Sequence, residues 1–215
     1  MSTHVSLKEA ERKAFRTAFQ DGLWDIFIGC VILQFAIAPL LSRRLGDFWS
    51  SAVFLPFWAL AFLATWLVRK YVVRPRVGVV KFGASRKTRL IRFNVVMLVL
   101  NLVAFILGIL AALTFGAVPG WTYPIGFGLI ILVGFSVAAY FLNFTRLYIY
   151  GALTGLSPLV GEWLYVVMKA PHHGFPITFG ATAGIMILTG LALLFRLLRD
   201  YPIPTYEPTS EKEIG

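Results

Sequence analysis

Six segments of about 20 mostly apolar residues constrain the fold of this chain more than any other feature. Each is long enough to cross the hydrocarbon core of a bilayer as a helix. The chain is 58% hydrophobic with a mean hydropathy of +0.77, more apolar surface than a soluble domain of 24.0 kDa can cover. We therefore expect an all-α polytopic membrane bundle of six transmembrane helices. The predicted spans are Leu23–Leu41, Phe48–Val68, Phe93–Phe115, Pro124–Leu142, Phe144–Met168 and Ile177–Leu198.

Lysine and arginine are distributed very unevenly between the two ends of these spans. When six spans are threaded through the membrane, 17 of the 20 basic residues fall on the side of the two termini and three on the other. Basic residues hold loops in the cytoplasm. The sequence therefore predicts that both termini are cytoplasmic.

The boundary between the fourth and fifth spans allows two interpretations. In the first, the turn falls at Leu142 and Asn143, and Asn143 caps the next helix. In the second, one long helix runs to Tyr150, and Ser157 and Pro158 open a short re-entrant helix. The first interpretation places more of the basic residues on one side of the membrane, and it is our prediction. Pro158 should kink the fifth helix because proline removes a backbone donor.

The residues before the first span predict an amphipathic helix on the membrane surface. Ser6 and Glu9 form a capping box, and apolar residues then recur at helical spacing. Arg12 and Arg16 belong to a basic stripe that suits anionic headgroups, and Gly22 ends the pattern. We expect this helix to be either a simple anchor or a helix that docks a partner or senses lipid.

The predicted organisation has three parts: an interfacial helix over 1–22, the transmembrane domain over 23–198, and a disordered cytoplasmic tail over 199–215. The largest polar segment is a cytoplasmic loop at 69–92, with nine basic residues, no acidic ones and a weak strand pattern near its centre. It is either an orientation signal or a surface for anionic lipid headgroups. No aromatic platform accompanies the charge, so we expect no nucleic-acid partner. The candidate lipid contacts are Arg74, Arg76, Lys81, Arg86, Lys87 and Arg89.

Glu162 is the strongest candidate for a functional residue, because it is the only carboxylate well inside a predicted span. It follows Gly151, Gly155, Pro158 and Gly161, which loosen or kink a helix. A kinked helix that presents a carboxylate suits a proton or cation site. The alternative is a hydrogen-bonded side chain that holds helices together, or one already close to water.

Other polar residues in the spans predict structural contacts. Asp25 and Arg146 enter their spans from the same side, so we expect an ion pair between them. Asn94 and Asn101 share one face of the third span and favour hydrogen bonds to another helix. Small residues at every fourth position predict close helix packing. They are Gly108, Ala112 and Gly116, then Gly134 and Ala138, Gly151 and Gly155, and Gly180 and Gly184. His172 and His173 are adjacent and make a poor chelate, so we expect a solvated pair.

Three short elements together resemble small multi-pass membrane proteins of prokaryotes that have no characterised activity. They begin at Asp21 before the first span, at Pro75 after the second and at Arg199 after the last. The resemblance covers about 20 residues and carries no activity with it. It implies a prokaryotic plasma membrane, either a bacterial inner membrane or an archaeal cell membrane.

No catalytic, cofactor or metal motif stands out in the sequence, so we expect a non-enzymatic protein. The leading hypothesis is a subunit, scaffold or accessory component of the membrane, with a membrane protein or a second copy of the chain as partner. The first alternative is a small transporter or channel that uses Glu162. The second alternative is a membrane enzyme acting on lipid, for which Asp47, His172 and His173 are a poor set.

Overall fold

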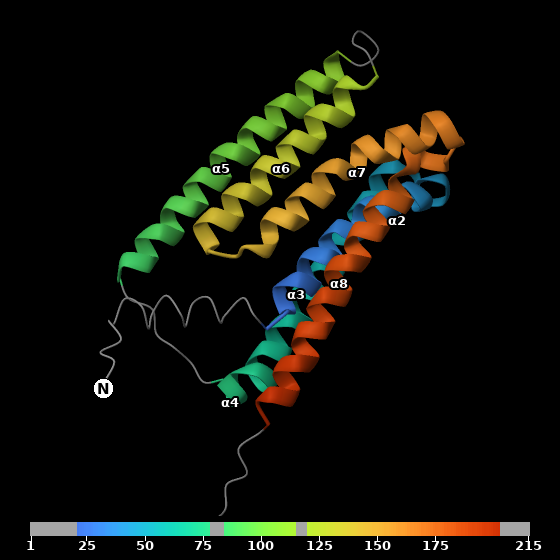
Figure 1. Cartoon of the computed structure of the whole chain (residues 1–215). Coiled ribbons are helices and arrows are strands. Elements are labelled where there is room, and N and C mark those ends of the chain that lie inside the picture. The colour runs from blue at the N-terminus through green and yellow to red at the C-terminus, as the bar shows by residue number, and fades with distance from the viewer. Residues whose placement is uncertain (1–20, 78–83, 115–119, 203–215) are drawn as a thin grey trace, which may run out of the picture.

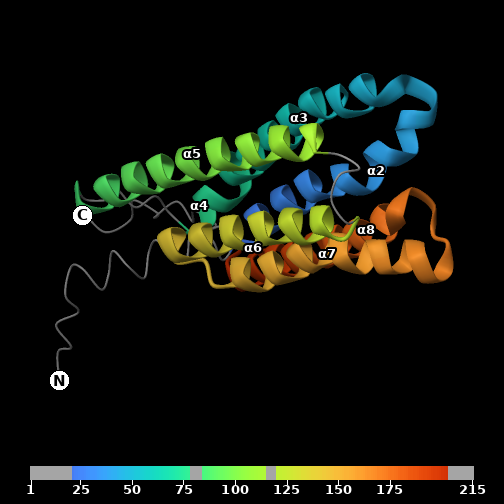
Figure 2. The same ribbon diagram turned by 90° about the horizontal axis from the view of Figure 1, so that it is seen from above.

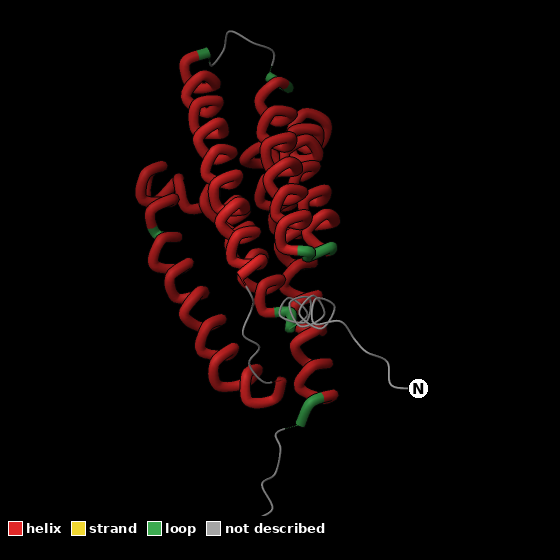
Figure 3. The backbone as a smooth tube through the Cα atoms, turned by 90° about the vertical axis from the view of Figure 1, so that its left-hand side faces the viewer, coloured by secondary structure: helices red, strands yellow, loops and turns green. Residues whose placement is uncertain are grey.

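The computed structural model describes residues 21–77, 84–114 and 120–202, and every regular element in these ranges is a helix. Short turns join most of them (Figure 3). The elements are α2 (Leu23–Ala52), α3 (Phe54–Val68), the π-helical turn η1 (Arg69–Val73), α4 (Arg74–Val77), α5 (Ala84–Leu113), α6 (Thr122–Leu142), α7 (Arg146–Met168), the 3₁₀ turn η2 (Pro171–Gly174) and α8 (Phe175–Asp200). The predicted all-α bundle is confirmed. The amphipathic helix and most of the tail lie outside the described residues.

Within the described residues, five helical segments are long and apolar enough to cross a membrane, and the chain is a membrane protein. They cover 23–46, 48–76, 88–113, 122–142 and 171–200. The fifth predicted span, Phe144–Met168, corresponds to α7, whose 23 residues would measure about 34 Å but which is not among these five apolar segments. This helix packs between α6 and α8 (Figure 1), so neighbouring helices shield its polar side chains.

The helices pack in the order α3, α2, α8, α7, α6, α5, with the most extensive contacts between α2 and α8 and between α6 and α7. Figure 2 shows α3 and α5 along one side of the molecule and α7 and α8 on the opposite side. The core cluster includes Ile32, Tyr150, Phe179 and Met186 from α2, α7 and α8. In contrast, no residue in the most apolar stretch of α5 is buried, and only 6% of the residues in the most apolar stretch of the span at 48–76, which contains α3, are buried. The interior of the bundle therefore lies around α2, α7 and α8.

Close backbone contacts hold the central helices together at glycines. A Cβ on Gly128 in α6 would lie 2.3 Å from the carbonyl oxygen of Gly155 in α7, and one on Gly151 would lie 2.6 Å from Phe135. The predicted close packing at Gly151 and Gly155 is thus confirmed. Gly108 in α5 and Gly184 in α8 instead have open space around them. These two glycines do not serve packing inside the bundle, whereas Gly190 of α8 does, since a Cβ there would lie 2.6 Å from the carbonyl oxygen of Gly22.

Neighbouring helices run in opposite directions, so the basic residues at the helix ends gather at one end of the bundle. This end contains the start of α2, α5 and α7 and the end of η1, α6 and α8, as shown by the contacts of Asp21 with Arg69 and of Arg89 with Tyr140. We call it the Asp25 end. The opposite end contains the Glu162–His173 contact and is called the Glu162 end.

The structure corrects both ends of the predicted cytoplasmic loop at 69–92. The segment 69–92 is not a separate loop, because helix continues from α3 through η1 and α4 to Val77 and begins again at Ala84. Arginine and lysine are good helix formers, so basic charge does not end a helix. The weak strand pattern lies largely at 78–83, outside the described residues.

Gly22, in the left-handed conformation (φ 76°), precedes α2 as predicted, and Gly46 (φ 78°) interrupts that helix after the first span.

The turn between the fourth and fifth spans lies where the sequence placed it, but Asn143 has a different role. It adopts the left-handed conformation (φ 52°) and ends α6, whereas Thr145 precedes α7. Asparagine is one of the few residues besides glycine that tolerates this conformation at a helix end. The re-entrant alternative is wrong, because α7 runs without interruption from Arg146 through Pro158 to Met168.

Candidate functional site at the buried polar seam

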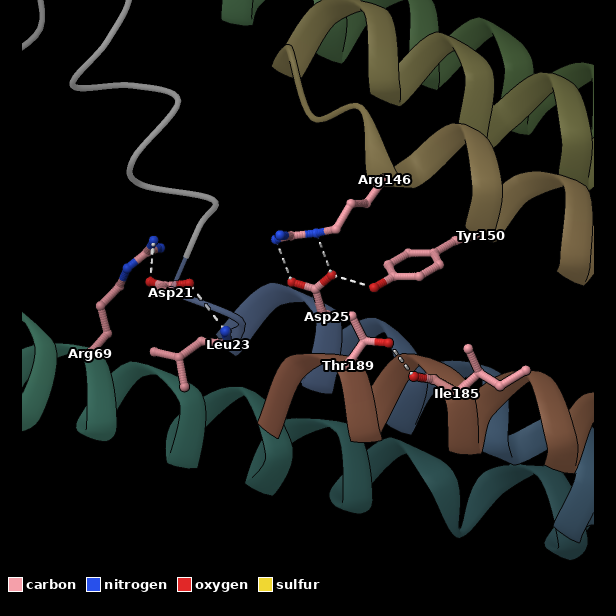
Figure 4. A network of polar contacts seen from close by, with 8 residues as sticks. All are labelled: Asp21, Leu23, Asp25, Arg69, Arg146, Tyr150, Ile185 and Thr189. Carbon is pink, nitrogen blue, oxygen red and sulfur yellow. Dashed lines mark hydrogen bonds and ion pairs between the residues drawn. The ribbon is translucent and has the colours of Figure 1, made fainter. Parts of the chain in front are cut away.

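Asp25 is completely buried and receives three hydrogen bonds from α7 (Figure 4). Arg146 Nε donates to Oδ1 over 3.0 Å and its Nη2 donates to Oδ2 over 2.9 Å. The Tyr150 hydroxyl donates to Oδ1 over 2.5 Å. Two parallel bonds from a guanidinium to a carboxylate are among the strongest ion pairs in proteins. The predicted pair is formed, and it joins the start of α2 to the start of α7.

Helical spacing explains why two groups of α7 meet one carboxylate. Arg146 and Tyr150 are four residues apart, so they lie one above the other on the same face of α7. Asp25 lies in the first turn of α2, where the helix dipole favours a negative charge. The ring of Phe144 lies 4.9 Å from the guanidinium carbon of Arg146 and covers one side of the pair.

A second ion pair joins α2 to the helix that follows α3. Arg69 Nη2 lies 2.9 Å from Asp21 Oδ2, while Asp21 Oδ1 accepts a hydrogen bond from the backbone N–H of Leu23. Asp21 therefore satisfies one of the free N–H groups at the start of α2. Burial raises the pKa of the Asp21 carboxyl above its ordinary value, and the nearby Arg69 guanidinium opposes this rise.

Hydroxyl groups continue the polar region along α7 toward its middle. Ser157 Oγ lies 3.0 Å from Thr182 Oγ1 of α8, and both residues are buried. Thr154 is fully buried, and its Oγ1 has no hydrogen-bond partner within the described part of the chain. Thr178 of α8 is also buried and donates to the carbonyl of Gly174. We call the set Asp25, Tyr150, Thr154, Ser157, Thr178 and Thr182 the polar seam.

Glu162 lies beyond the seam at the opposite end of α7. Its Oε2 is 2.8 Å from Nδ1 of His173, and 16% of its side chain is exposed against 55% for the histidine. The carboxylate thus has a partner and some access to solvent. The histidine ring also stacks on Tyr165, with ring centroids 4.3 Å apart. His172 and His173 both adopt positive φ angles of 51° and 53°, uncommon for residues other than glycine.

The candidate lipid contacts divide into two groups. Arg74 is exposed at the Asp25 end, whereas Arg76 and Arg89 are half-buried and contact protein. Arg76 donates to the carbonyl of Val72, and Arg89 donates to the carbonyl of Tyr140 over 2.6 Å. Arg89 therefore holds the start of α5 against the end of α6. Lys81 and the side chains of Arg86 and Lys87 lie outside the described part of the structure.

Sequence reasoning missed most partners of the candidate residues. It did not pair Arg69 with Asp21, although their opposite charges at one end of the bundle were a usable signal. It treated His173 as a solvated residue, whereas the ring contacts Glu162. It expected Asn101 to bond a neighbouring helix, but Nδ2 donates to the carbonyl of Met97 in its own helix.

Among the described residues, no three histidine, cysteine or acidic side chains are grouped in a way that could hold a metal ion. Comparison with known protein families, with curated proteins and with solved structures found no match to this chain.

Proposed function

We propose that this chain is a non-enzymatic membrane protein that works as a subunit, scaffold or accessory component through the exposed face of α5. The observation that carries the proposal is Asn101. This asparagine lies near the middle of the span at 88–113, and its side chain is exposed. Its amide oxygen makes no hydrogen bond within the described residues. In lipid such a group is best satisfied by a polar group on another helix.

The surroundings of Asn101 support a helix–helix contact at this place. Gly108 lies seven residues away on the same face and has open space where a side chain would be. Small residues let a second helix come close, and the amide then gains a hydrogen bond worth roughly 0.6–2 kcal/mol. The central helices already bind one another through a buried ion pair, and none of the most apolar part of α5 is buried, so α5 has the most surface left for a partner.

The test is purification of the tagged full-length chain in mild detergent, followed by mass determination and identification of bound proteins. Asn101→Leu should lose the partner or the second copy. Thr65→Val is the matched control, because the Thr65 hydroxyl donates to the carbonyl of Ala61 in its own helix. Equal mass and composition for the wild type and both variants would contradict the proposal.

The orientation of the chain in the membrane is proposed from the excess of basic residues at one end of the bundle. We place the Asp25 end, where Arg69, Arg74, Arg89 and Arg146 gather, in the cytoplasm of a prokaryotic plasma membrane. Of the candidate contacts, exposed Arg74 is the best placed for an anionic headgroup. Arg89 is already engaged with α6.

A second candidate function is proton or cation transport, and a specific observation favours it. Glu162 is paired with a histidine, the side chain that most readily gains and loses a proton near neutral pH. The pair lies at one end of α7, and the buried Asp25 group lies at the other. If Glu162 takes part, Glu162→Gln should keep the fold and abolish the flux of protons or cations into liposomes.

A further inference from the structure

Polar side chains line one face of α7 from Arg146 to Ser157, and Thr178 of α8 continues the polar region beside Gly161. Arg146, Tyr150, Thr154, Ser157 and Gly161 follow one another at intervals of three or four residues, so they share one face of the helix. From residue 146 to residue 161 this face covers about 22 Å at 1.5 Å per residue. The hydrocarbon core is about 30 Å thick.

Contacts on both sides of Thr154 show that this face points into the bundle. One turn before it, Tyr150 reaches Asp25 on α2. One turn after it, Ser157 lies against Thr182 on α8. Farther along, a Cβ on Gly161 would lie 3.3 Å from the hydroxyl of Thr178. The line therefore connects the buried ion pair with the region next to Glu162.

Thr154 holds two oxygen atoms that lack the expected partners. Its hydroxyl is fully buried and makes no hydrogen bond within the described chain. Its carbonyl lies four residues before Pro158, which has no N–H to donate to it. Buried polar atoms without partners are rare in proteins, and a bound water is a common reason for them. The hydroxyl and the carbonyl of this one residue, between Tyr150 and Ser157 on α7, provide polar partners for a water.

Electrostatics favours a water over a metal cation at this position. The neighbouring groups on the seam are neutral hydroxyls, and the charge of Asp25 is balanced by Arg146. A cation without a counter-charge in this low-dielectric region would carry a large desolvation cost. Hydroxyls and water can each donate and accept a hydrogen bond, so a line of them can pass a proton from one oxygen to the next.

We propose that the polar seam, completed by a water bound at Thr154, is a path for protons between the Glu162 end and the Asp25 end. The inference rests on the second function proposed above. A proton enters at the Glu162–His173 pair and leaves at the Asp25 carboxyl group, which it reaches through the Tyr150 hydroxyl. Arg146 keeps its charge throughout and holds the carboxyl group in place. At each step one O–H bond forms and one breaks, so charge balances without an oxidant or reductant.

The experiment uses the full-length chain in liposomes that contain a pH-sensitive dye, with a potassium diffusion potential to drive protons. Thr154→Val keeps the shape and removes the hydroxyl, and it should lower the proton flux about tenfold, the effect of losing one hydrogen bond. Thr154→Ser restores a hydroxyl and should restore the flux. Thr65→Val removes a hydroxyl from α3 and should leave the flux at the wild-type level.

The outcomes separate the path from transport itself. Flux that Glu162→Gln abolishes and Thr154→Val leaves unchanged would overturn the path while transport stands. Flux of the wild type no greater than that of protein-free liposomes would overturn both. Melting temperatures of the variants in detergent show whether each is folded. Loss of flux in a folded Thr154→Val variant with recovery in Thr154→Ser supports the path.

Discussion

Arg146→Gln is the perturbation whose cost can be worked out most closely. The substitution removes both guanidinium bonds to Asp25 and leaves only the Tyr150 hydroxyl. Removing one partner of a buried ion pair typically costs 3–5 kcal/mol. The carboxyl has another option, since it can bind a proton. Starting from an ordinary pKa of about 3.9, protonation costs about 4 kcal/mol at pH 7 and about 1.5 kcal/mol at pH 5.

In the variant, Asp25 either stays charged without its partner or binds a proton, and the less costly of these two states determines the loss of stability at each pH. We expect Arg146→Gln to lower the free energy of unfolding by about 3–4 kcal/mol at pH 7 and by no more than about 1.5 kcal/mol at pH 5. The measurement is equilibrium unfolding in mixed detergent micelles at both pH values. The double variant Asp25→Asn with Arg146→Gln removes both charges and should lie within about 1 kcal/mol of the wild type.

The control for this series is an exposed ion pair of the same residue types. Arg196 and Asp200 are 74% and 42% exposed and 3.5 Å apart. Such pairs contribute little to stability because water screens them. Arg196→Gln should therefore leave unfolding unchanged at both pH values. A cost below about 1 kcal/mol for Arg146→Gln at pH 7, or an equal cost at pH 5 and pH 7, would refute the reasoning.

Two further predictions concern the Asp25 end. Arg69→Gln removes the cation that lowers the pKa of buried Asp21, so that pKa rises further. A carboxyl with a raised pKa loses its stabilising contribution as the pH rises through that value, so the variant should melt lower at pH 7 than at pH 5, relative to the wild type. For the orientation, in a Cys30→Ala background, a cysteine introduced at Gly120 should react with an impermeant reagent added outside cells. One introduced at Tyr201 should not, and the reverse pattern would exclude the proposed orientation.

The sequence predicted the helices well because membrane insertion depends on the length and apolarity of each segment. These properties placed α6 and α8 to within two residues of their observed ends. Helix ends in the basic region were predicted poorly, since arginine and lysine continue a helix as readily as they end a span. The Asp25–Arg146 pair could be predicted because two opposite charges entered the membrane from the same side.

The rest of the seam could not be predicted, because it depends on how each helix is rotated about its axis. Small residues at four-residue spacing occur on both α5 and α7, yet only those of α7 make close contacts. The pairing of Ser157 with Thr182 likewise requires α7 and α8 to face each other at one height. A pattern within one helix fixes which residues share a face, but not which neighbour that face meets.

The two proposals concern separate parts of the molecule, and this separation makes them testable independently. The polar seam lies among α2, α7 and α8, whereas Asn101 is on α5, which packs mainly against α6. Distant sites with no shared partners usually act additively. Asn101→Leu should therefore change association and leave proton flux intact, and Thr154→Val should do the opposite. If Asn101→Leu also abolished the flux, conduction would require the assembled complex, and the path along α7 would have to be completed by a partner.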